Sequence, residues 1–143
     1  MRFVPAVVVS VALGALVACG GTSTETTSPK AAWMAKHGDA ITTLNHDLEV
    51  ARTTLSSLQR PDILGNCNQL RDSLGEARKG LPVPDADADA ALRSALDAVA
   101  AGVEDCIQGA RGPDIPRLEK SFGELREANT LMDVADKRLD AWT

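Results

Sequence analysis

Apolar residues recur at alternating steps of three and four along this chain, and this spacing constrains the fold more than any other feature of the sequence. In the first series only His37 is polar; its members are Met34, His37, Ile41, Leu44, Leu48, Ala51, Leu55 and Leu58. Such steps place all the side chains on one face of an α-helix. Ser28 and Pro29 suit the N-cap and the first helical position, and Pro61 disfavours helical geometry in the residue before it. The sequence therefore predicts a long helix that begins at Pro29 and stops near Pro61.

Three further series follow, the first two with the same steps and the last with a spacing closer to 3.6 residues. Their members are Ile63, Cys67, Leu70, Leu74, Ala77 and Leu81, then Leu92, Leu96, Val99, Val103, Cys106 and Ala110, and finally Leu118, Phe122, Leu125, Ala128, Leu131, Met132, Ala135, Leu139 and Trp142. Pro82 and Pro84 end the second helix, and Gly112 with Pro113 ends the third, because proline cannot continue a helix. No segment alternates with a period of two, so we expect no β-sheet.

Short connections between consecutive helices favour antiparallel neighbours. We therefore predict an all-α fold, an up-down-up-down four-helix bundle formed by residues 29–143. A three-helix core with the second or third helix packed irregularly is the alternative. The first and last helices are expected to be the longest and to overhang the middle pair at the end where the chain enters the bundle.

The amino terminus has the layout of an export signal. Met1–Arg2 is positively charged, and residues 3–18 form an apolar run that is short for a membrane-spanning helix but typical of a secretory signal peptide. The run ends in Leu16-Val17-Ala18-Cys19, and Gly20 follows. This pattern resembles the lipobox of bacterial lipoprotein precursors. The resemblance implies cleavage before Cys19 and lipid on the Cys19 sulfur.

On this resemblance the chain divides into a signal peptide (1–18), the lipidated Cys19 with a flexible tether (19–28), and the helical bundle domain (29–143). The tether is small and polar, as a flexible linker should be. The implied location is the cell membrane, on its extracytoplasmic face, with the lipid on Cys19 as the anchor. An ordinary signal peptide with a chance cysteine and an uncleaved anchor are the alternatives. The Ala/Asp/Arg-rich, Lys-poor composition also resembles that of small actinobacterial lipoproteins.

With Cys19 assigned to the lipid, Cys67 and Cys106 remain as an even pair in an exported domain, which is typical of a disulfide. Both lie on the apolar faces of their helices, at heights that agree within about one helical turn when measured from the connection between the first two helices. We therefore expect an inter-helix disulfide between Cys67 and Cys106. Two buried free thiols or a metal site are the alternatives, although a metal site would lack CxxC spacing and a nearby histidine.

Large side chains gather where the tether should enter the bundle. The candidate ligand or partner surface consists of Trp33, Met34, His37, Met132 and Trp142. One interpretation is plain core filling between the overhanging helices. The other is a surface or pocket that contacts lipid headgroups, a protein partner or a small ligand.

Several function classes find no support in the sequence. The chain carries 20 acidic and 15 basic residues, a balance that argues against a nucleic-acid partner. Asp85, Asp87 and Asp89 are spaced like the start of an EF-hand loop, but Ala90 and Leu96 stand where that loop needs Gly and Glu. No serine, threonine or cysteine stands in a nucleophile motif. We therefore expect no enzymatic activity, no catalytic residues, no bound metal and no cofactor.

The expected function is that of a lipid-anchored, non-enzymatic helical domain on the outer face of a bacterial membrane. Its expected partners are the membrane, through the lipid on Cys19, and an envelope protein, with a wall polymer or a second copy of the chain as the alternatives. Such a domain would serve as a protein-interaction or envelope-associated module. The alternative is a carrier or sensor of a small apolar ligand, haem or metal bound at the membrane-proximal end of the bundle.

Overall fold

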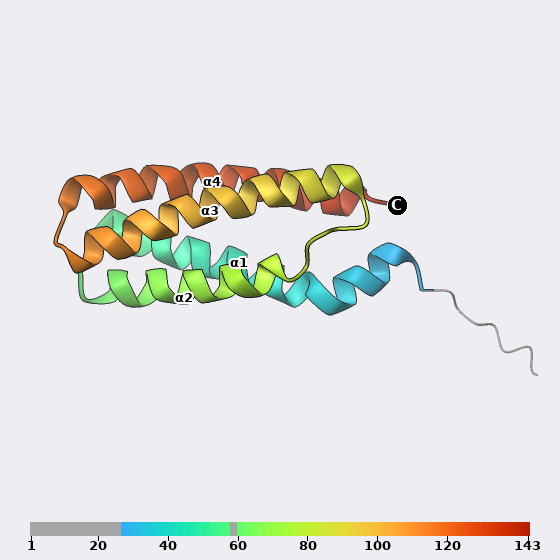
Figure 1. Cartoon of the computed structure of the whole chain (residues 1–143), viewed down its shortest axis with the longest axis horizontal. Coiled ribbons are helices and arrows are strands. Elements are labelled where there is room, and N and C mark those ends of the chain that lie inside the picture. Colours follow the sequence, from blue (N-terminus) through green and yellow to red (C-terminus); the bar gives the residue numbers. More distant parts are fainter. Residues whose placement is uncertain (1–26, 58–59) are drawn as a thin grey trace, which may run out of the picture.

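The computed structural model describes residues 27–57 and 60–143, and these form four helices. The helices are α1 (Pro29–Ser57), α2 (Arg60–Arg78), α3 (Ala86–Arg111) and α4 (Ile115–Ala141). Figure 1 shows them side by side in one bundle, each running opposite to the helix before it. We call the end where α1 begins and α4 stops the entry end, and the opposite end the distal end. The expected signal peptide, the lipidated Cys19 and the tether up to residue 26 lie outside the described residues.

Each helix packs against the next one in sequence, and α1 also packs against α4, which closes the bundle. The buried residues of all four helices form one apolar cluster at the centre. The predicted up-down-up-down four-helix bundle is therefore confirmed, and the three-helix alternative is wrong. None of the described helices is long and apolar enough to cross a membrane.

Side chains cap three of the helix starts, and one of these caps is Ser28, as the sequence predicts. The Ser28 hydroxyl accepts a hydrogen bond from the Ala31 N–H at 3.1 Å. The carboxylate of Asp85 accepts from the Ala88 N–H at 2.9 Å, and that of Asp114 accepts from the Arg117 N–H at 3.1 Å. These bonds satisfy backbone donors that have no partner within the first turn of a helix.

The expected overhang is present for only one of the two outer helices. Because the stretch after Asp85 is helical from Ala86 onward, α3 has 26 residues against 27 in α4. The end of α4 therefore lies level with the start of α3, whereas the first turns of α1 extend beyond the other helices (Figure 1).

α3 and α4 approach each other closely because glycines remove side chains from their contact. A Cβ atom on Gly102 would lie 2.5 Å from Leu125 Cδ2, and one on Gly109 would lie 2.9 Å from Leu118 Cδ2. The buried Ser121 hydroxyl donates a hydrogen bond to the Gly102 carbonyl at 2.7 Å. Each glycine thus accepts a leucine of α4 in the space where its own side chain would be.

A disulfide joins Cys67 of α2 to Cys106 of α3, with 6.2 Å between the two Cα atoms. Both residues are fully buried. The predicted disulfide is confirmed, and the two alternatives, free thiols and a metal site, are wrong for this pair.

Polar side chains add to the attachment of α1. Gln69 Nε2 of α2 donates to the buried carboxylate of Asp47 at 2.9 Å, and Asn66 Nδ2 donates to the Thr54 hydroxyl at 2.8 Å. The contacts of α1 with α2 therefore combine apolar packing with specific hydrogen bonds.

Candidate functional site

Two tryptophans close the entry end of the core. Trp33 and Trp142 are only 7% and 8% exposed, and their rings meet edge to face with centroids 6.2 Å apart. The Trp33 indole N–H donates to the Gly80 carbonyl at 2.8 Å, which ties the start of α1 to the residues that follow α2. Core filling is therefore the role that the structure gives to these two rings, since the polar group of Trp33 finds its partner inside the protein.

Met34 does not lie on the core face where the spacing predicts it. Its side chain is 38% exposed, whereas the neighbouring Trp33 is buried. Successive helical side chains point about 100° apart, so both residues cannot face the same core. The larger Trp33 ring, held by Gly80, takes the inner position. Placing Met34 on the core face was therefore wrong.

Met34 instead lines a surface hollow of about 250 Å³ between α1 and α4, together with Ile41 and Leu139. The carboxylate of Asp136 stands at the same hollow and accepts a hydrogen bond from Asn45 Nδ2 at 3.1 Å. Burial raises the pKa of the Asp136 carboxyl above its ordinary value, and the negative charges of Asp133 and Asp140 raise it further. This hollow is thus partly apolar and partly acidic.

His37 faces a different side of α1. Its ring packs against the Trp33 ring at a centroid distance of 5.3 Å and lies beside a hollow of about 370 Å³ between α1 and α2. The other residues around this hollow are Lys36, Ala40, Glu76 and Lys79. Lys79 donates to both oxygens of the Glu76 carboxylate at 2.7 Å.

The five residues of the predicted surface therefore point in different directions. Trp33, Trp142 and the 1% exposed Met132 belong to the core, His37 faces the hollow beside α2, and Met34 faces the hollow beside α4. The expected gathering of Trp33 and Trp142 is present, but the five side chains do not converge on one cavity. Within residues 27–57 and 60–143, no three His, Cys, Asp or Glu side chains are grouped as a metal would need.

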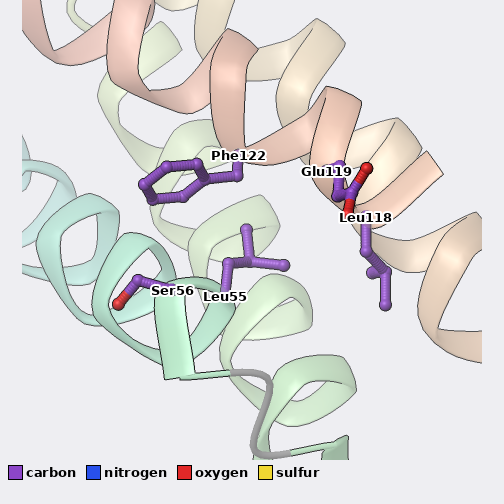
Figure 2. Close-up of a pocket in the computed structure, with 5 residues that line it drawn as sticks. All are labelled: Leu55, Ser56, Leu118, Glu119 and Phe122. Carbon is purple, nitrogen blue, oxygen red and sulfur yellow. The ribbon is translucent and has the colours of Figure 1, made fainter. Parts of the chain in front are cut away.

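A third hollow, which no sequence pattern indicated, lies between α1 and α4 near the distal end (Figure 2). It measures about 260 Å³ and is lined by Leu55, Ser56, Leu118, Glu119 and Phe122. Figure 2 shows the Phe122 ring pointing from α4 toward Leu55 and Ser56 of α1. Phe122 occupies a core-spaced position in the sequence, so spacing alone could not show that it is only partly buried.

A smaller hollow of about 140 Å³ adjoins the third one and shares Ser56 and Phe122 with it. Glu49 and Arg52 line it from α1, and the Arg52 guanidinium donates to the Glu49 carboxylate at 2.5 Å. The contact between α1 and α4 is thus hollowed near both of its ends.

Comparisons with protein-family models, with curated proteins and with solved structures found no match for this chain. The geometry alone therefore defines its class, an all-α protein built as an up-down-up-down four-helix bundle with one inter-helix disulfide.

Proposed function

We propose that this protein is a lipid-anchored, non-enzymatic helical module on the outer face of a bacterial membrane, where it contacts another component of the cell envelope. The observation that carries the proposal is the disulfide between Cys67 and Cys106, taken together with the Leu16-Val17-Ala18-Cys19 pattern. Disulfides persist in oxidising compartments outside the cytoplasm, which is where a lipobox would send the chain.

The shape of the entry end favours surface contact over a carrier role. Trp33 and Trp142 fill the core where an enclosed ligand would have to sit. The hollows described above lie on the outside of the bundle, along the contacts of α1 with α2 and α4. Shallow hollows with mixed apolar and polar walls suit the side chains of a protein partner.

The anchor is tested by expressing the full chain in a bacterial host and determining the mass of its first peptide. We expect the mature wild-type chain to begin at a diacylglyceryl-modified Cys19 and to fractionate with membranes. Cys19→Ala should remain an unprocessed precursor, whereas Ser23→Ala, a matched change in the tether, should behave like the wild type. Normal cleavage and membrane retention of Cys19→Ala would refute the anchor.

Envelope contact is tested with a photo-crosslinking residue at Ser56, on the rim of the hollow in Figure 2. The matched control carries the same residue at Asp72, an exposed position on α2. We expect a discrete cross-linked protein from Ser56 and none from Asp72 when intact cells are irradiated. Equal labelling from both positions, or a small molecule co-purifying at one equivalent in place of a protein, would contradict the proposed contact.

A further inference from the structure

Lysine is scarce in this protein and is concentrated at one end of the bundle. The five lysines are Lys30, Lys36, Lys79, Lys120 and Lys137, and only Lys120 lies toward the distal end. Lys120 is held there by the carboxylates of Asp105 and Glu124. The other four lysines lie near the entry end, close to the residue where the tether joins α1.

The charges of the entry end are divided between two edges. On the α1–α2 edge, residues 29–40 and 75–81 carry four basic and two acidic side chains. Two of the four basic side chains reach the other edge, since Lys30 donates to the Asp140 carbonyl and Arg78 pairs with Asp97, so Lys36 and Lys79 are the lysines that remain on the first edge. On the α3–α4 edge, residues 85–97 and 133–143 carry seven acidic and three basic side chains. An anionic surface near this end would therefore attract the first edge and repel the second.

The basic edge contains the hollow between α1 and α2. Because Lys79 is bonded to Glu76, those two charges neutralise each other, and the Lys36 ammonium remains as the net charge of the hollow. The side chains of Lys36 and Lys79 are exposed. The volume of about 370 Å³ gives room for a phosphate-bearing headgroup beside the Lys36 ammonium, with Lys79 at the same hollow.

We propose that this hollow binds anionic lipid headgroups, so that the α1–α2 edge of the bundle faces the membrane. The inference rests on the proposed anchor at Cys19, which is nine residues before Ser28. Nine extended residues span at most about 30 Å, so a lipid on Cys19 keeps the entry end within reach of the membrane surface. Within about 10 Å of the surface, lysines gain from the negative potential of anionic lipids, and the carboxylates of the opposite edge are kept away.

The test is amine acetylation of the full lipidated protein in vesicles of phosphatidylcholine alone or mixed with phosphatidylglycerol. Mass spectrometry gives the extent of acetylation of each lysine. We expect acetylation of Lys36 and Lys79 to fall about threefold or more on the anionic vesicles. Lys137, at the same end but on the acidic edge, and Lys120, toward the distal end, should not change.

Charge reversal supplies the matched variants. Lys36→Glu should abolish the protection of Lys79 on anionic vesicles, whereas Lys137→Glu should leave it intact. Equal acetylation of Lys36 on both kinds of vesicle would overturn the proposal, and so would equal protection of Lys137. Protection of Lys36 on neutral vesicles by added glycerol phosphate would indicate a site for soluble anions and would also overturn it.

The same sample separates this inference from the function on which it rests. A first peptide without lipid on Cys19 would refute the anchor and, with it, the membrane contact. A lipidated first peptide with unchanged Lys36 and Lys79 would refute the proposed orientation alone.

Discussion

At the level of single residues, side chains that are neighbours in sequence differ sharply in burial. Trp33 is enclosed by Trp142, His37 and Gly80, while Met34, the next residue, faces solvent beside α4. The carboxylate of Asp136 is half-buried near two other acidic side chains.

Replacing Trp33 should weaken the fold far more than replacing Met34. Trp33→Ala removes a buried ring and should lower the free energy of unfolding by about 3–5 kcal/mol. Trp33→Phe leaves the Gly80 carbonyl without its donor and should cost about 1–3 kcal/mol. Met34→Ala, at an exposed site, should stay within about 0.5 kcal/mol of the wild type. Urea denaturation measures all three, and equal losses for Trp33→Ala and Met34→Ala would contradict the burial described for Trp33.

Asp136→Asn should stabilise the protein at neutral pH. Folding raises the pKa of Asp136, so the folded state holds the proton more tightly than the unfolded chain, and the ionised carboxylate opposes folding. The asparagine oxygen can still accept the hydrogen bond from Asn45. The gain over the wild type should be largest near pH 7 and should vanish once the pH falls below the ordinary aspartate range.

Thermal unfolding between pH 3 and pH 7 measures this difference. Glu127→Gln, an exposed change on the same helix, supplies the control and should show no such dependence. A gain for Asp136→Asn that persists at pH 3 would count against burial and like-charge repulsion as its cause.

At the level of helices, α3 and α4 form the close pair, and α1 is the more open partner. Glycines at the α3–α4 contact let leucines of α4 approach the backbone of α3. The contact of α1 with α4 is hollowed near both ends, and side-chain hydrogen bonds to α2 and α4 help to hold α1 in place. The hollows of about 140 to 370 Å³ therefore lie along α1, while glycines bring α3 and α4 close together.

Two glycine-to-alanine changes should have opposite effects. In Gly102→Ala, the new methyl group would overlap Leu125 and should destabilise the protein by about 1–3 kcal/mol. In Gly123→Ala, the methyl group would meet no atom within 4 Å, and the better helix propensity of alanine should stabilise by up to about 1 kcal/mol. Denaturant midpoints measure both changes, and a Gly102→Ala variant as stable as Gly123→Ala would contradict the close approach of α3 and α4.

At the level of the whole molecule, one covalent link and one division of charge organise the bundle. The disulfide ties the two middle helices together toward the distal end. At the opposite end, the α1–α2 edge is basic and the α3–α4 edge is acidic. The molecule is therefore covalently cross-linked toward its distal end and carries opposite net charges on the two edges of its entry end.

The double variant Cys67→Ser/Cys106→Ser should lose about 4 kcal/mol of stability, because the disulfide closes a loop whose ends are 39 residues apart. Denaturation of the wild type with and without a reductant should show a loss of similar size. The reductant should leave the double variant unchanged. A wild type whose unfolding midpoint does not respond to full reduction would contradict a stabilising role for the disulfide.

Much of the architecture was predictable because local rules and periodicity govern it. Ser28 marks a helix start through its own side-chain chemistry, and the spacing of apolar residues defines the buried faces. The cysteine pairing followed from matching heights on adjacent helices. The signal, the lipidation of Cys19 and the function stay predictions, because they concern processing and partners and not the packing of the bundle.

The candidate site was less predictable, because it depends on which of several suitable side chains is buried in the core. Spacing alone predicted that Met34 lies in the core. In the structure Trp33 lies there instead, and its indole N–H donates to the Gly80 carbonyl, which is distant in sequence. Periodicity therefore dictates helices, their faces and their order, since those are properties of a chain segment and its neighbours along the chain. Only the tertiary structure decides which rings are enclosed, where α1 and α4 leave hollows and which edge of the entry end is basic. These features depend on contacts between segments that are distant in sequence, and no local pattern contains those partners.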